Sequence, residues 1–173
     1  MKTKLYSLTL AGLMSASCFG QQMDWESYDP PSTLVVPESP ITKAKFPFID
    51  VHSHQYRMGP SDLDDRIVEM DAMNMGIMVN LSGRGGSQLK AMASNVQKHH
   101  PSRFALFTNI DFNNVDETNW APRTISRLEE DVQNGAKGLK VYKSLGLSNK
   151  DTQGNRIAVD DPRLDPVWAK CGE

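Results

Sequence analysis

The sequence predicts an α/β fold in which about four βα units build a parallel sheet. Three observations lead to this prediction: short apolar runs recur along the chain, segments with apolar residues at helical spacing separate them, and Gly or Pro marks most junctions. Such alternation favours parallel strands joined by right-handed crossovers. The two common outcomes are an open doubly wound sheet and a (β/α)8 barrel, and in both the functional residues follow the carboxyl ends of the strands.

The first expected strand, residues 46–54, is an apolar run that ends in a His-x-His pair, His52 and His54. Side chains alternate between the faces of a strand, so Asp50 is expected on the same face as both histidines. Neutral imidazole is a common zinc ligand, and two imidazoles on one strand reach a single ion without rearrangement. The alternative is a packed or solvated pair that binds nothing. An apolar strand before the pair and a Gly-Pro turn after it favour the metal interpretation.

The next unit is a helix expected to begin at Ser61, as its N-cap, and to end at Gly76. Its methionines stand at helical spacing and are expected in the core rather than as copper ligands. A short strand follows at residues 77–81, and then a glycine-rich loop at residues 82–86. The loop lacks the spacing of a P-loop or a dinucleotide fingerprint, which favours a flexible turn, and Arg84 within it is a candidate to hold a substrate carboxylate.

The elements expected after this loop are a helix from Ser87 to Pro101, a strand at 104–110, a helix at 121–135, a strand at 138–142 and a helix from Asp165. Asp111 directly follows one of these strands and is therefore a candidate substrate-binding residue. His99 and His100 stand in the last turn of a helix, where positive charge suits the helix dipole, so capping is favoured over metal binding.

The N-terminus predicts an exported protein. Residues 1–20 combine a cationic start, an apolar stretch and a small-residue end, which is typical of a secretory signal peptide. The apolar stretch is too short for a stable membrane span, and lipid attachment at Cys18 is a less favoured alternative. Residues 21–45 are polar and proline-rich, and predict an extended leader. The expected location is therefore the periplasm or the exterior.

Residues 46–173 are expected to form a partial barrel domain. A (β/α)8 barrel typically needs about 250 residues, whereas the whole chain has 173. The apparent last helix also runs to the end of the sequence without a clear stop. We therefore expect an N-terminal piece of a longer protein.

The motifs resemble the amidohydrolase superfamily, and specifically the amidohydrolase-related group that includes metal-dependent decarboxylases. The resemblance runs from about residue 48 to the last residue. Besides the His-x-His pair, it rests on Gly135-Ala-Lys-Gly-Leu-Lys-Val-Tyr-Lys143, Met70-Asp-Ala-Met73, Pro101-Ser-Arg-Phe104 and Asp160-Asp-Pro-Arg-Leu164. It implies a distorted TIM barrel.

The resemblance also implies roles for particular residues. His52 and His54 match the first-strand metal ligands, and Lys140 falls where some members carry a carboxylated lysine that bridges two metals. Many relatives use no such bridge, and a buried, paired cation or a substrate contact is the plainer explanation for this lysine. The further histidines and the catalytic aspartate of the family belong to later strands, which are expected beyond residue 173.

These observations predict a metal-dependent hydrolase that acts on an amide, ester or lactone bond of a small-molecule substrate through a metal-activated water. Zinc is the favoured ion, with manganese or iron as alternatives. The alternative functions are a decarboxylase of the same fold, with Arg84 as a carboxylate clamp, and an inactive or binding remnant. The formal net charge of -2 gives no reason to expect nucleic acid as a partner. The oligomeric state stays open.

Overall fold

The computed structural model describes residues 26–37 and 39–173. The predicted signal peptide with Cys18 lies outside these residues, as does part of the predicted leader. The described residues fall into two units, which meet between residues 39 and 40. All helices and strands of the described residues lie in the second unit. No helix in the described part of the chain combines the length and the hydropathy needed to cross a membrane.

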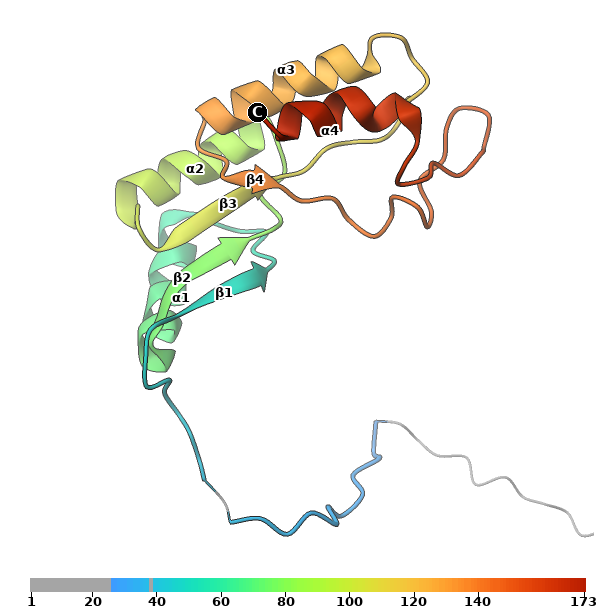
Figure 1. The fold of residues 1–173 in the computed structure, drawn as a ribbon. Coiled ribbons are helices and arrows are strands. Elements are labelled where there is room, and N and C mark those ends of the chain that lie inside the picture. The colour runs from blue at the N-terminus through green and yellow to red at the C-terminus, as the bar shows by residue number, and fades with distance from the viewer. Residues whose placement is uncertain (1–25, 38) are drawn as a thin grey trace, which may run out of the picture. The chain divides into compact units, whose positions relative to one another are not determined.

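The second unit is an α/β structure in which four strands and four helices alternate (Figure 1). The strands are β1 (Phe48–Ser53), β2 (Met75–Asn80), β3 (Phe104–Thr108) and β4 (Gly138–Leu139). The helices are α1 (Pro60–Met73), α2 (Ser87–His99), α3 (Trp120–Gln133), the 3-10 turn η1 (Pro162–Leu164) and α4 (Asp165–Cys171). The strands are parallel, in the order β1-β2-β3-β4, and form a curled sheet. The predicted α/β class and the four βα units are confirmed, and the curled sheet is compatible with part of a βα barrel.

Helix α1 differs from its prediction at both ends. Its N-cap is Gly59, whose N–H donates to the Asp62 carboxylate at 3.0 Å, so the predicted capping role of Ser61 is wrong. The helix ends at Asn74, which adopts the left-handed conformation with φ 65°. Asparagine tolerates this region, and the predicted stop, Gly76, lies inside β2.

Three other boundaries are shifted. Ser87 is the first residue of α2 rather than its cap, which is Gly86. Strand β3 is shorter than predicted, and β4 contains only two of the five predicted residues. The pairing of β3 with β4 covers Phe107–Gly138 and Thr108–Leu139, and just beyond it the Asn109 side-chain amide donates to the Lys140 carbonyl at 3.1 Å. Helix α3 lies close to its predicted range.

Strand β1 contains an irregularity that sequence alternation does not anticipate. Asp50 pairs with Met78 but Ser53 pairs with Asn80, so the register shifts between Asp50 and Ser53. The shift breaks the simple alternation that put Asp50 on the face of His52 and His54. Instead, the Asp50 carboxylate accepts a hydrogen bond from the His52 backbone N–H at 2.9 Å. The predicted shared face is therefore wrong.

One edge of β1 is open. Among the described residues β1 pairs with β2 alone, while β2 and β3 each have a strand on both sides. Two apolar side chains of β1, Ile49 and Val51, are 54% and 68% exposed. The outer strand therefore carries apolar side chains into solvent along an edge without a partner.

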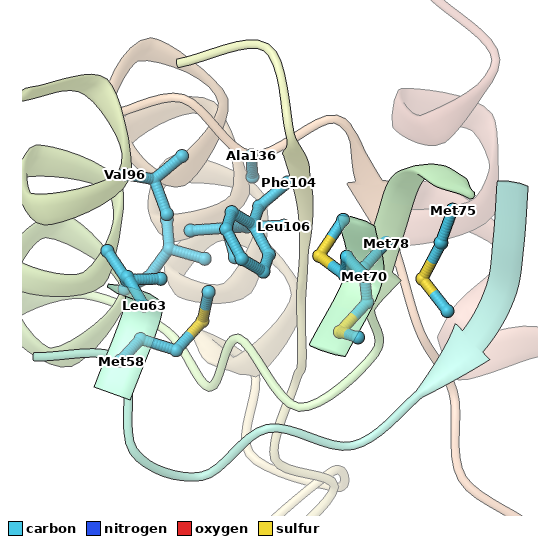
Figure 2. Close-up of a cluster of buried hydrophobic side chains, with 10 residues drawn as sticks. Met58, Leu63, Met70, Met75, Met78, Val96, Phe104, Leu106 and Ala136 are labelled. Carbon is cyan, nitrogen blue, oxygen red and sulfur yellow. The ribbon is translucent and has the colours of Figure 1, made fainter. Parts of the chain in front are cut away.

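The first hydrophobic core lies between the sheet and helices α1 and α2 (Figure 2). Its β3 residues, Phe104 and Leu106, alternate as expected when one face of a sheet packs on helices, whereas its β2 residues, Met75 and Met78, are three positions apart. Its ten buried members are Met58, Leu63, Met70, Met75, Met78, Leu89, Val96, Phe104, Leu106 and Ala136. The predicted core role of the methionines is confirmed here, although Met73 is 40% exposed.

A second core packs α3 against α4 and the loops around β4. Its buried members are Phe112, Val115, Trp120, Leu128, Leu145, Ile157, Leu164 and Val167. The candidate site lies at the carboxyl ends of the strands.

Candidate functional site

Asn80, the last residue of β2, holds the loop that follows the histidine pair. Its side chain is fully buried. The amide nitrogen donates to the Gln55 carbonyl at 2.8 Å, and the amide oxygen accepts from the backbone N–H groups of Gln55 and Ser82, each at 2.9 Å. Three backbone groups from two loops therefore depend on this one side chain. Sequence reasoning missed it, although asparagine at the end of an apolar strand is an unusual strand residue.

Asn109, just beyond β3, likewise uses its side chain to bond the backbone of neighbouring segments. Its amide nitrogen donates to the carbonyls of Leu81 and Lys140, each at 3.1 Å, and its oxygen accepts from the Arg84 N–H at 3.0 Å. The side chain thus joins the ends of β2 and β4 to the glycine-rich loop. Together with Asn80, it fixes the edge of the sheet at which the predicted site residues lie.

His52 and His54 come together at this edge. Their Nε2 atoms are 3.2 Å apart, and the ring planes are inclined by 65°. Nδ1 of His54 lies 2.8 Å from the Ser82 hydroxyl, which lies 2.9 Å from the Tyr142 hydroxyl. The Tyr142 hydroxyl also donates to the Leu81 carbonyl at 3.2 Å.

This chain of contacts assigns the proton of His54. A carbonyl oxygen only accepts, so the Tyr142 proton points to Leu81 and its oxygen accepts from Ser82. The Ser82 oxygen then accepts from His54 Nδ1–H. Nε2 of His54 is then unprotonated and accepts a hydrogen bond from His52 Nε2–H at 3.2 Å. The same lone pair would bind a metal ion once His52 Nε2 loses its proton.

The geometry of the pair fits a shared divalent ion. Two nitrogens bound to a tetrahedral zinc at about 2.0–2.1 Å lie about 3.3–3.4 Å from each other, close to the 3.2 Å between the two Nε2 atoms. Two ligands are fewer than the three that catalytic zinc sites take from the protein. Within residues 26–37 and 39–173, no group of three or more His, Cys, Asp or Glu side chains is arranged for a metal ion.

Lys140 lies at the same edge, directly after β4. Its backbone is fixed on both sides, since its N–H donates to the Thr108 carbonyl at 2.8 Å and its carbonyl accepts from Asn109. The residue is half-buried. Its ammonium group forms no ion pair with a described carboxylate, and the ligand role predicted for it stays a prediction.

A cavity of about 660 Å³ lies beside the histidine pair. Arg84 and Asp111, the two predicted substrate-binding residues, both line it, together with Ser82 and Tyr142, which contact His54. Other lining residues were missed: Tyr56, Gly85, Gln88, Asn109, Ile110, Asn113, Trp120, Arg123, Thr124 and Arg127. A sequence signal did exist in the i,i+4 spacing of Arg123 and Arg127, which places both on one helix face.

The glycine-rich loop is a bonded segment rather than the predicted flexible turn. Three of its backbone N–H groups have acceptors: Gly83 donates to the Phe107 carbonyl at 3.1 Å, Arg84 to Asn109, and Gly86 to the Asp131 carboxylate at 2.7 Å. Asp131 is fully buried, and its second oxygen accepts from the Thr108 hydroxyl at 2.6 Å. A buried carboxylate on α3 therefore fixes the loop against β3.

Comparison of the chain with protein-family models, curated proteins and solved structures finds no match. The interpretation of the site therefore rests on its own geometry.

Proposed function

We propose that this chain carries part of the active site of a metal-dependent hydrolase that acts on an amide, ester or lactone bond. The observation that carries the proposal is the 3.2 Å separation of the His52 and His54 Nε2 atoms at the carboxyl end of a parallel strand. We further propose that the curled sheet belongs to a (β/α)8 barrel, whose catalytic residues stand at this end of the strands.

In the proposed site, His52 and His54 hold a divalent ion, with zinc favoured over manganese or iron. When bound, the ion supplies Lewis acidity and an activated water for attack on a carbonyl group. Ser82 keeps the proton of His54 on Nδ1, so that the unprotonated Nε2 faces His52, and the ion would take the place of the proton between the two Nε2 atoms. Asn80 holds the backbone N–H of Ser82 in place and thereby supports this orientation.

The proposed site needs at least one ligand beyond the two histidines, because catalytic zinc sites take three from the protein. Lys140 is the candidate among the described residues, since its backbone is fixed at the same sheet edge. As a carbamate, its side chain would offer a carboxylate oxygen.

The proposal is tested with the full chain in two measurements. Equilibrium dialysis against zinc should give stoichiometric binding to the native chain and a loss of binding in the His52→Ala/His54→Ala variant. His99→Ala is the matched control, because this histidine is exposed in the last turn of α2. Because this chain alone is expected to be inactive, the intact protein with the later strands is then loaded with zinc or manganese and assayed with a panel of amides, esters and lactones, as native protein and as the same double variant. A double variant that hydrolyses the panel as fast as the native chain would rule the proposal out.

Decarboxylation is the second candidate, and the position of Arg84 favours it. The guanidinium group lines the cavity and lies 5.8 Å from the centre of the Tyr56 ring, where it can meet a substrate carboxylate. Release of carbon dioxide from unsaturated or aromatic acids, without hydrolysis of the panel, would favour this reaction over hydrolysis. Zinc binding without either activity in the intact protein would favour a binding protein instead.

A further inference from the structure

We infer that the cavity beside the histidine pair is a subsite for an anionic group of the substrate, and that Arg84, Arg123 and Arg127 hold this group. The inference rests on the proposed function in one respect, which is that the reacting bond of the substrate lies at the histidine pair. The anion subsite itself rests on the cavity alone. The shared chemistry of its ligands is an oxyanion, either a carboxylate or a phosphate.

The three arginines come from two elements that the fold brings together. Arg84 belongs to the loop after β2, whereas Arg123 and Arg127 stand one turn apart on α3. All three line the same cavity of about 660 Å³. Guanidinium groups offer planar pairs of donors that match the oxygens of a carboxylate or phosphate. Three of them around one cavity are suited to a single oxyanion.

The positive charge of the cavity is only weakly compensated. Arg123 is 3.4 Å from Glu117, but the two side chains are 54% and 46% exposed, so this pair contributes little. In the part of the chain that the structure describes, no carboxylate lies within ion-pair distance of Arg84 or Arg127. The one carboxylate in the lining, Asp111, accepts from the backbone N–H and the side-chain amide of Asn113, at 2.9 and 3.2 Å.

The loop is shaped to admit one of these arginines. Gly86 has φ +57° and ψ −133°, and a Cβ atom on it would come within 2.6 Å of Arg127 Nη2. The absence of a side chain at Gly86 therefore leaves room for the guanidinium group. Asp131 fixes the same glycine through its backbone N–H. The loop and the helix thus place Arg127 at the cavity as one unit.

The position of the cavity defines a substrate class. Ser82 and Tyr142 line it and also contact His54. A small acid with its oxyanion at the arginines would therefore extend toward the histidine pair. Within the proposed function, the substrate is an acid that carries its amide, ester or lactone bond a few atoms from a carboxylate or phosphate.

Calorimetry and the fluorescence of Trp120, which lines the cavity, measure this binding in the full chain without any activity assay. The probes are succinate, inorganic phosphate and the uncharged succinamide. We expect succinate or phosphate to bind and succinamide not to bind. Arg123→Gln and Arg127→Gln should each weaken anion binding by about tenfold, which is the loss of one charge-assisted hydrogen bond. Arg156→Gln is the control, since Arg156 is exposed and outside the cavity.

The outcomes separate the two proposals. Preference for phosphate over succinate would support the subsite and identify a phosphoryl group as its ligand. Equal binding of succinamide, or binding that Arg123→Gln and Arg127→Gln leave unchanged, would overturn the inference. His52→Ala/His54→Ala should abolish zinc binding and preserve anion binding. Arg123→Gln and Arg127→Gln should weaken anion binding and preserve zinc binding. Failure of one arm therefore leaves the other proposal standing.

Discussion

The buried carboxylate of Asp131 accepts a hydrogen bond from the backbone N–H of Gly86 at 2.7 Å. Removal of the carboxylate takes an acceptor from the half-buried Gly86 N–H and from the buried Thr108 hydroxyl, which costs about 1–3 kcal/mol. We therefore expect Asp131→Ala to lower the free energy of unfolding by at least this amount in urea denaturation, and Asp131→Asn to lower it less, because the amide keeps one acceptor. Glu130→Gln, an exposed neighbour on α3, should leave it unchanged. Equal stability of Asp131→Ala and Glu130→Gln would show that the contact is not formed.

Ser82→Ala removes the acceptor of His54 Nδ1–H. Partners of this kind typically contribute about 10- to 100-fold to metal affinity. We expect zinc binding to weaken by about tenfold in competition with a chromogenic chelator. Ser126→Ala, at an exposed serine of α3, is the control and should bind zinc as the native chain does. Unchanged affinity in Ser82→Ala would mean that the hydroxyl does not orient His54.

Gly86→Ala separates backbone strain from the placement of Arg127. The backbone conformation of Gly86 is open to glycine almost alone, so alanine should cost about 1–3 kcal/mol. Its methyl group would also displace the Arg127 guanidinium group and weaken anion binding. Gly154→Ala is the matched control, because Gly154 has φ +85° with no atom within 4 Å of an added Cβ. The control should lose stability but bind succinate normally, and a normal affinity in Gly86→Ala would contradict the proposed role of the loop.

Asp161 should contribute a pH-dependent part of the stability. The Arg163 guanidinium group donates to its carboxylate at 2.9 and 2.5 Å and lowers the pKa of Asp161 below its ordinary value of 3.8. A lowered folded-state pKa means that the contribution is fully present above the unfolded-state value and is lost as the pH falls through the folded-state value. We expect Asp161→Asn to be less stable than the native chain at pH 7, with a gap that narrows below about pH 4. Urea midpoints at several pH values measure the difference in stability between the two proteins. A difference that does not change with pH would contradict the role proposed for Asp161.

The order of the elements was predictable because apolar periodicity is a local property of the sequence. The ends were less predictable, since they depend on contacts that apolar periodicity does not encode. Just beyond the last β3–β4 pair the Asn109 side chain bonds to the Lys140 carbonyl, and Gly59 caps α1 at its start. The register shift in β1 depends on pairing with β2 and leaves no mark in the alternation of its residues.

The candidate site was predictable only in part. His52 and His54 share one short motif, so their proximity follows from the chain itself. Arg123 and Arg127 reach the cavity only because α3 packs beside β3, which a single sequence does not reveal. The sequence gives no sign that Asp131 is buried, because it stands among other charged residues of α3. Its carboxylate is buried against two donors from other elements, the Gly86 N–H and the Thr108 hydroxyl.

The open edge of β1 has a consequence for handling the protein. A strand that offers unpaired N–H and C=O groups beside exposed Ile49 and Val51 is a template for another strand, and so a point where aggregation begins. Aggregation of this chain should therefore increase with its concentration unless a further strand, as in the proposed barrel, covers β1. A lysine at position 51 would act as a gatekeeper, since its charge opposes the approach of a second edge without removing a buried side chain.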